Sequence, residues 1–239
     1  MAQKNIDIPE IGPVIFKKST KSRRLTIRIK ALEGVQVSVP QSYTYAMGEA
    51  FVIQKKEWIL KHLPKMQKME ENFSTFREDT DFRTRNHVLK ILRHKDEKIL
   101  LRIGKGETQI LIPEHRNIEE GSIQEAIRFG IEKTWRKEAL AYLPQRVAYF
   151  AQKHNFKYQK LSIKNTRTRW GSCSHQNNIN LSLHLMRLPD ELIDYVILHE
   201  LCHTVEKNHG PGFWKLLDKV SGDARGLDKQ MKKYQIKIY

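Results

Sequence analysis

The sequence predicts an α+β protein with a β-rich region first and a mainly helical region after it. Two observations support this class. Before residue 118, apolar residues alternate with polar ones in several short runs, which is typical of strands. After residue 119, apolar residues recur every three or four positions, which is typical of helices. The 239 residues suffice for two small domains, which we expect at residues 1–118 and 119–239.

The first strands are predicted by two alternating runs, one centred on Ile27 and the other on Val37. Both runs fall within residues 14–39. Between them, Glu33 and Gly34 predict a hairpin turn, since glycine tolerates the backbone conformations that tight turns need. The N-terminal region is therefore expected to begin with an antiparallel strand pair.

The rest of the N-terminal region mixes helix, linker and strand signals. Residues 70–85 are polar with weak periodicity and predict a linker, whereas residues 88–112 predict further strands with a turn at Gly104 and Gly106. Residues 45–67 predict one helix, whose apolar face is formed by Phe51, Ile53, Trp58, Ile59 and Leu63.

The C-terminal domain is expected to combine helices with a small sheet. Residues 122–156 predict a long helix that Pro144 kinks or divides. Two short strands are predicted at residues 161–163 and 179–183. A further helix is expected from Pro189 to about Lys207, and a last one begins near Pro211 and ends before Gly222.

The chain is strongly basic, with 43 Lys and Arg residues against 27 Asp and Glu residues and a net charge of +16. Residues 17–68 carry 12 basic and 3 acidic side chains, and no acid occurs between Glu138 and Asp190. Such asymmetry predicts a positive field over part of the surface. Either this surface binds an acidic partner such as DNA or RNA, or it is only a solvated lysine-rich surface.

Composition excludes several classes of protein. The mean hydropathy is −0.60, and no stretch approaches 18 uncharged apolar residues, so we expect no membrane partner. The first ten residues contain no apolar run, which disfavours a secretory signal. Two cysteines, Cys173 and Cys202, cannot form a disulfide framework, so we expect a cytoplasmic protein. The sequence leaves the oligomeric state open.

The segment His199-Glu200-Leu201-Cys202-His203 carries the strongest chemical signal. Residues four apart lie on one face of a helix, so His199 and His203 can direct two imidazoles at one metal ion. Glu200 lies about 100° around the helix, beside the metal, where its carboxylate can accept a proton from water. This is the H-E-x-x-H arrangement of zinc metallopeptidases.

A catalytic zinc ion, Zn²⁺, needs a third protein ligand, and His209 is the next candidate. Residues 207–212 contain Asn208, Gly210 and Pro211, which favour a turn that brings His209 back towards the helix. Two alternatives remain. The histidines could be ordinary helix residues, or the zinc could be structural with Cys202 as a fourth ligand. Because Cys202 lies on another face of the helix, we interpret it as a small buried residue.

The loop before the second short strand contains candidate substrate-binding residues. Trp170, Gly171 and Ser172 could form a strand edge that binds an extended peptide. Trp170 could instead be a core anchor, and Gly171 a bulge or a close-packing glycine. Arg169 could stabilise an oxyanion, hold an acidic substrate, or form a simple salt bridge.

These residues closely resemble the YgjP-like metallopeptidase family, which has been grouped with the SprT-like and WLM zincins. The resemblance is specific over residues 160–220 and weaker elsewhere. At Glu206 the sequence lacks the glycine with which metzincins end this helix, which disfavours a metzincin. The matching segments are Arg169–Ser174, Ile179–Leu181, Pro189, Ile193–His203, Asn208-His209 and Phe213-Trp214.

The resemblance implies a zincin-like metallopeptidase domain after the β-rich region. It implies that His199, His203 and His209 hold zinc and that Glu200 is the catalytic acid and base. We therefore expect a peptidase that hydrolyses peptide bonds of a protein or peptide substrate, with nucleic-acid-associated proteins as one class of target. The alternative is a nucleic-acid-binding factor in which the zinc domain is mainly structural.

Overall fold

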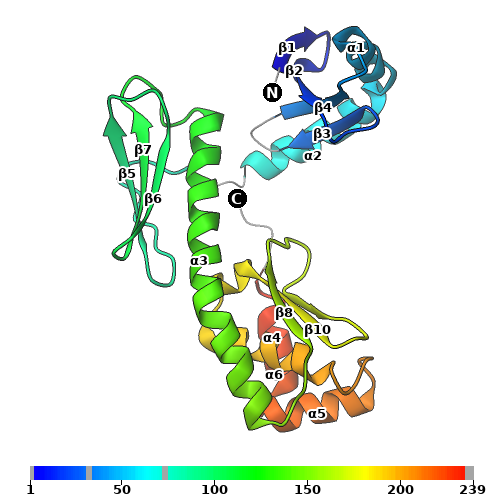
Figure 1. Cartoon of the computed structure of the whole chain (residues 1–239), viewed down its shortest axis with the longest axis vertical. Helices are drawn as coiled ribbons and strands as arrows, with labels where there is room; N and C mark the ends of the chain where they lie inside the picture. Colours follow the sequence, from blue (N-terminus) through cyan, green and yellow to red (C-terminus); the bar gives the residue numbers. More distant parts are fainter. Residues whose placement is uncertain (1–2, 31–33, 72–74, 235–239) are drawn as a thin grey trace. The chain divides into compact units, whose positions relative to one another are not determined.

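The computed structural model describes residues 3–30, 34–71 and 75–234. It confirms a mixed architecture of helices and several small sheets, with strands concentrated in the N-terminal half (Figure 1). The chain divides into two compact units: Met1–Thr75 with Glu119–Glu125, and Phe76–Ile118 with Ala126–Ile238. This division groups residues 76–118 with the C-terminal part of the chain, unlike the division at 118/119 that the sequence predicts.

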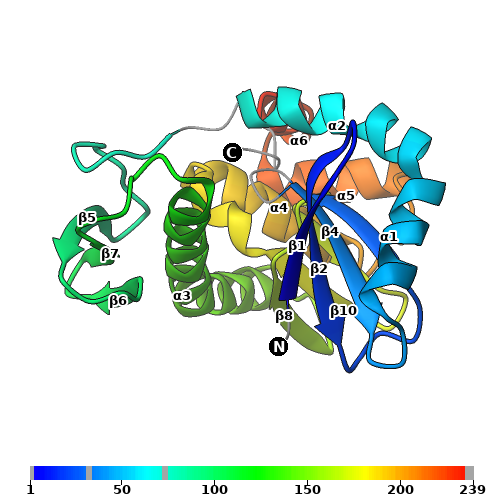
Figure 2. The ribbon, with the colours of Figure 1, turned by 90° about the horizontal axis from the view of Figure 1, so that it is seen from above.

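The first unit contains a four-stranded sheet in the order β1-β2-β4-β3 and two helices (Figure 2). Strands β2 and β4 are parallel, and the other neighbouring pairs are antiparallel. The core holds Phe16, Val37, Val52 and Ile59, contributed by both strands and helices. The elements are β1 (Gln3–Ile8), β2 (Gly12–Ser19), β3 (Thr26–Lys30), β4 (Gly34–Pro40), α1 (Tyr45–Gln54) and α2 (Lys56–Glu71).

The hairpin predicted in this unit is confirmed, because β3 pairs antiparallel with β4 in a register that places Lys30 opposite Gly34. Gly34 has a φ of +69°, a conformation that glycine adopts at no steric cost. The other predicted turn residue, Glu33, lies outside the described residues. Strand β1 was not predicted, since its sequence is polar and its side chains are mostly exposed.

The single helix predicted over residues 45–67 is two helices. The backbone leaves helical geometry at Lys55, whose φ is −99° and ψ is 13°, and α2 begins at the next residue. Helix α2 contains Pro64 and still continues to Glu71. The break occurs without the glycine or proline that marks a helix end in a sequence.

The second unit begins with a three-stranded sheet packed against a long helix. The sheet has the order β5-β7-β6, with strands β5 (Val88–His94), β6 (Leu100–Gly104) and β7 (Glu107–Pro113). The helix α3 (Gly121–Lys153), which belongs to this unit from Ala126 onwards, passes through Pro144 without dividing. Thr108 on β7 and Thr134 on α3 share a buried hydrogen bond of 2.6 Å, which joins the two elements.

The last part of the second unit is a small sheet with helices packed on it. Strand β10 is central, parallel to β8 and antiparallel to β9, which is outermost. Helix α4 is largely buried and packs against β9, α5 and α6. The elements are β8 (Lys160–Lys164), β9 (Gly171–Cys173), β10 (Asn178–Ser182), the 3₁₀ helix η1 (Leu183–Arg187), α4 (Asp190–Cys202), α5 (Pro211–Ser221) and α6 (Ala224–Met231).

Helix α4 is anchored from α3 and ends earlier than predicted. An ion pair between Arg146 and Asp194 joins α3 to α4. The helix ends at Cys202 instead of near Lys207, because residues 203–206 form a tight turn in which backbone N–H groups bond to Leu201 and Cys202. Across the three described ranges, no helix combines the length and apolarity that spanning a membrane requires.

Candidate metal centre

Three imidazoles converge at the end of α4. His199 lies in the last turn of the helix, His203 caps it, and His209 lies just before α5. The Nε2 atom of His209 is 3.0 Å from that of His199 and 3.2 Å from that of His203. The candidate ligand atoms of all three residues lie within 4.8 Å of one another. The turn after α4 thus brings the third histidine to the other two, as the sequence predicts.

The spacing of these nitrogens fits a tetrahedral metal ion. Ligands placed about 2.05 Å from zinc at tetrahedral angles are separated by about 3.3 Å, close to the two observed distances. Burial, then the neighbouring imidazoles, lowers the pKa of His199 to about 3. Burial also lowers the pKa of His203. Both rings are therefore neutral near pH 7, which is the form that binds a metal.

Neighbouring groups fix the orientation of the rings. The Nδ1 atom of His203 lies 2.9 Å from the carbonyl oxygen of Glu206, so this nitrogen donates the proton and leaves Nε2 as an electron-pair donor. The buried ring of Phe213, from α5, packs against all three imidazoles with centroid distances of 4.5–4.9 Å. The site is therefore pre-organised by the protein itself.

Glu200 lies beside the histidines with an unusual environment for a carboxylate. Its side chain is buried, and within the described residues its Oε2 atom has no hydrogen-bond partner. Burial raises the pKa of Glu200 to about 8, partly opposed by the positive charge of Arg169. A cation held by the three imidazoles would favour the ionised form. A carboxyl group with such a pKa can both accept and donate a proton near neutral pH.

Gly171 on β9 lies directly against the Glu200 side chain. A Cβ atom on Gly171 would lie 2.6 Å from Oε1 and 2.7 Å from Cγ of Glu200, which is too close for any real contact. Because β9 is an edge strand, its other edge has no strand partner within the described part of the sheet. The glycine thus brings an edge strand without a second partner in the described sheet into contact with the buried carboxylate.

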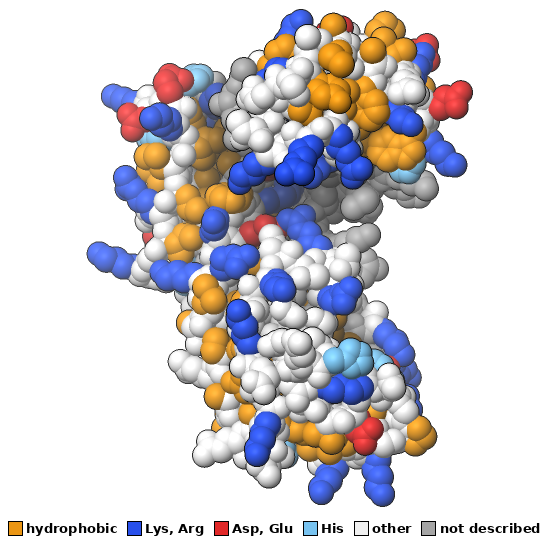
Figure 3. Space-filling model, turned by 45° about the vertical axis from the view of Figure 1, so that its right-hand side comes forward, with side chains coloured by type: hydrophobic (Ala, Val, Ile, Leu, Met, Phe, Trp, Pro, Cys, Tyr) orange, Lys and Arg blue, Asp and Glu red, His pale blue; other side chains and the backbone are white. Residues whose placement is uncertain are grey.

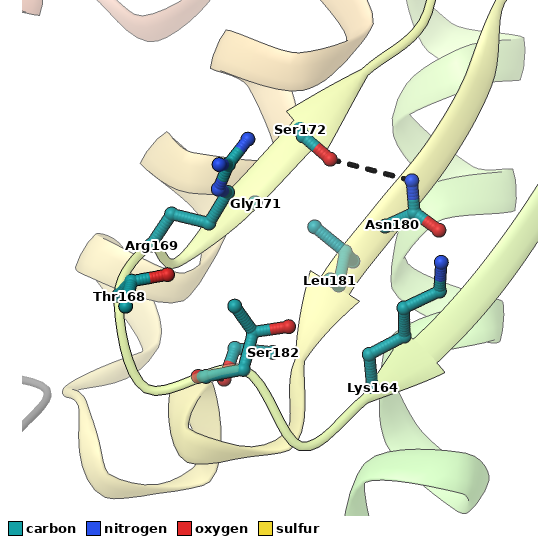
Figure 4. Close-up of a pocket in the computed structure, with 9 residues that line it drawn as sticks. Lys164, Thr168, Arg169, Gly171, Ser172, Asn180, Leu181 and Ser182 are labelled. Atoms are coloured by element: carbon teal, nitrogen blue, oxygen red, sulfur yellow. Dashed lines mark hydrogen bonds between the residues drawn. The ribbon is translucent and has the colours of Figure 1, made fainter. Parts of the chain in front are cut away.

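A cavity of about 260 Å³ lies on the outer side of the same sheet (Figure 4). Arg169 and Ser172 line it, together with Gly171. Figure 4 also shows Lys164, at the end of β8, extending towards Asn180 on β10. The side-chain amide of Asn180 donates a hydrogen bond of 3.3 Å to the Oγ atom of Ser172.

The structure therefore brings together most residues that the sequence singled out. His199, His203 and His209 form one cluster, and Glu200 follows His199 directly in α4. Of the four residues considered for substrate binding, Arg169, Gly171 and Ser172 line the cavity, and Gly171 is a close-packing glycine. Trp170 is half-buried and does not line the cavity, and its carbonyl oxygen accepts a hydrogen bond from the backbone of Ser182.

Cys202 does not join the histidines. It is fully buried, and burial raises its pKa to about 12, as expected of a small core residue. Among the described residues, the cluster around the imidazoles contains only the three histidines as candidate ligands. Sequence reasoning missed the part that Lys164 plays in the cavity, since its only signal was membership of a long basic run.

Three converging imidazoles beside a buried carboxylate are the arrangement of a metal-dependent hydrolytic enzyme. The YgjP-like metallopeptidase domain matches residues 23–234 of the chain. The chain therefore belongs to the YgjP-like family of metallopeptidases. Membership implies a protein or peptide substrate.

Two crystal structures show similarity to parts of the chain. One is the metallopeptidase zymogen of Pyrococcus abyssi abylysin, with 21% identity over 40% of this chain and 98% of that one, and a TM-score of 0.35. The other is the metallopeptidase zymogen of Methanocaldococcus jannaschii jannalysin, with 23% identity over 38% and 93% of the two chains, and a TM-score of 0.34. A comparison with curated proteins finds no match.

Proposed function

We propose that this chain is a zinc-dependent peptidase in which His199, His203 and His209 hold the metal and Glu200 is the catalytic acid and base. One observation carries the proposal: the Nε2 atom of His209 lies 3.0 and 3.2 Å from those of His199 and His203, and the next residue after His199 is a buried glutamate whose Oε2 atom has no hydrogen-bond partner among the described residues. A merely structural zinc site would need a fourth protein ligand and no base.

In the proposed reaction, the metal and Glu200 have different roles. When bound, zinc supplies a Lewis acid that acidifies water and polarises a peptide carbonyl. Glu200 accepts the proton of the attacking water and later donates it to the leaving nitrogen. Its burial keeps competing water away and strengthens its interaction with nearby charge.

The open edge of β9 supports a binding mode for the substrate. An extended peptide can add to this edge through main-chain hydrogen bonds, as peptides do in other strand-addition complexes. Gly171 would then place the peptide beside Glu200, since the glycine backbone already touches that side chain. Main-chain recognition of this kind tolerates many sequences, so side-chain preference must come from elsewhere on the site.

The test combines metal content with proteolysis. Purified protein should contain about one zinc per chain, and His203→Ala should lose it because two imidazoles bind zinc far more weakly. Glu200→Gln should keep the zinc and the fold but lose about 10²–10⁴-fold in rate, measured as casein cleavage or self-cleavage. Zinc-dependent cleavage that persists unchanged in Glu200→Gln would refute the proposed role of Glu200.

A second candidate function is nucleic-acid binding, which would direct the peptidase to nucleic-acid-associated proteins. Its support is the loop before β3, where Lys21, Arg23 and Arg24 are exposed. In the described part of the chain these three side chains have no ion-pair partner. Figure 3 shows Lys and Arg side chains spread over the visible face with few acidic ones between them.

A further inference from the structure

The cavity on the outer side of the β8-β10-β9 sheet is polar and positively charged. Lys164 and Arg169 supply the charge, and Thr166, Thr168, Ser172 and Asn180 supply hydroxyl and amide groups. No aspartate or glutamate is among the residues that line it. Charged and hydroxyl donors around a space of about 260 Å³ are suited to an anion such as a carboxylate or a phosphate.

The two cations of this cavity differ from other basic residues in the same region. Arg146 and Arg167 form ion pairs with Asp194 and Glu132, which neutralise them. Within the described ranges, neither Lys164 nor Arg169 forms such a pair. Their charges are therefore available to a ligand.

The hydrogen-bond pattern also leaves a donor facing the cavity. Because the amide of Asn180 donates to Ser172 Oγ, the hydroxyl hydrogen of Ser172 remains available to another acceptor. Figure 4 shows these two side chains on adjacent strands, with Lys164 extending towards them. An anion here could accept bonds from both a cation and a hydroxyl group.

The cavity adjoins the metal centre through β9. Gly171 lines the cavity and also touches Glu200, and Arg169 lines the cavity while its charge acts on the same carboxylate. Successive residues of a strand point to opposite faces. In a peptide added to the edge of β9, every second side chain would therefore point to the face on which Ser172 and the cavity lie.

We propose that this cavity binds an acidic or phosphorylated side chain of the peptide substrate, close to the bond that is cleaved. The inference rests on the proposed function and adds a substrate class to it. A peptide is favoured over nucleic acid because the cavity is small, adjoins the strand edge and contains no aromatic side chain for base stacking.

The experiment uses the zinc-loaded full chain and matched peptides. A peptide library first locates cleavage sites. Peptides carrying Glu, phosphoserine or Gln at the selected position are then compared by kcat/KM. Wild type should prefer the Glu and phosphoserine peptides by roughly tenfold, as expected for one charge-assisted contact. Lys164→Glu should abolish or invert that preference, whereas Lys164→Arg should retain it.

The matched control is Lys157→Glu, which makes the same change of charge at an exposed lysine outside the cavity. It should keep the wild-type preference. Equal cleavage of the Glu and Gln peptides by wild type, or equal effects of Lys164→Glu and Lys157→Glu, would overturn the proposal.

A binding measurement without turnover separates the proposed peptidase function from the proposed binding site in the cavity. Fluorescence anisotropy of the same peptides on Glu200→Gln should show tighter binding of the acidic peptides, dependent on Lys164. If no peptide is cleaved by wild type but this preference persists, the peptidase assignment fails, and the cavity is an acidic-peptide site without the neighbouring cleavage. If an oligonucleotide, and no acidic peptide, binds in a Lys164-dependent manner, the cavity proposal fails.

Discussion

A buried carboxylate oxygen without a hydrogen-bond partner is costly, and within the described residues the Oε2 atom of Glu200 is such a group. Glu200 directly follows His199 in the sequence. A cation held by the imidazoles can therefore offset part of the cost of burying this carboxylate. Removing the metal should therefore leave Glu200 largely protonated near pH 7, because burial raises its pKa to about 8.

The contact between Gly171 and Glu200 gives a prediction at the scale of one residue. Gly171→Ala places a methyl group where the Glu200 side chain lies, so the carboxylate must move. We expect proteolysis to fall by about tenfold or more, since small displacements of a catalytic group are costly. Zinc content should be unchanged, because no proposed ligand is touched.

Gly104→Ala is the matched control for this change. A Cβ atom at Gly104 meets nothing within 4 Å, so this variant should keep wild-type activity. If Gly171→Ala also keeps full activity with bound zinc, the position of Glu200 against β9 does not matter for the reaction.

At the scale of elements, η1 is held against the rest of the second unit by a buried histidine. The Nε2 atom of His184 lies 2.8 Å from Asn165 Oδ1, and its ring meets the edge of Trp135 on α3. Burial, reinforced by Arg187 and Arg167, lowers the pKa of His184 to about 4 from 6.5. The folded protein therefore keeps this residue neutral.

This shift predicts how stability depends on pH. Between pH 6.5 and pH 4 the unfolded chain binds a proton at His184 that the folded chain does not, so stability falls as the pH falls. From pH 8 to pH 5 the loss due to this residue should be about 2 kcal/mol. Urea unfolding of metal-free wild type and His184→Gln should show a smaller loss in the variant. Equal losses of stability in the two proteins would show that His184 does not cause this pH dependence.

Local signals in the sequence predicted the elements that depend on neighbours along the chain. The H-E-x-x-H spacing and the glycine and proline after it predicted that three histidines would meet, because a helix and one turn determine their positions. The β3–β4 hairpin was predictable for the same reason. In contrast, the break at Lys55 has no local signal, and the early end of α4 at Cys202 depends on the turn that follows it.

The cavity could not be predicted because its residues come from three strands and a loop. Lys164 and Asn180 are brought together by the parallel pairing of β8 with β10, which no periodicity in the sequence specifies. The contact of Gly171 with Glu200 likewise depends on how α4 packs against β9. Motifs therefore predicted the histidine cluster, whereas tertiary packing determines the cavity and the contact with Gly171 around it.

At the scale of the whole molecule, the net charge of +16 is less available than the composition suggests. Lys18 donates hydrogen bonds to backbone carbonyls around Pro40 and Tyr43, and Lys17 to the side chain of Gln36. These two ammonium groups therefore already form hydrogen bonds within the first unit. In the same unit, Lys21, Arg23 and Arg24 in the loop before β3 are exposed and have no ion-pair partner among the described residues, so their charges are available to a partner.

Nucleic-acid binding through that loop would have a measurable salt dependence. Each phosphate neutralised contributes about 0.9 to the slope of log K against log salt for double-stranded DNA. Reversing Lys21, Arg23 and Arg24 together to Glu should therefore lower the slope by about 3, measured by anisotropy with a labelled duplex. Reversing Lys95, Lys98 and Lys105, which are exposed in the second unit, changes the net charge equally and should have a smaller effect. If both triple variants weaken DNA binding alike, the attraction comes from net charge and not from this loop. If wild type does not bind the duplex at low salt, the basic surface is only a solvated one.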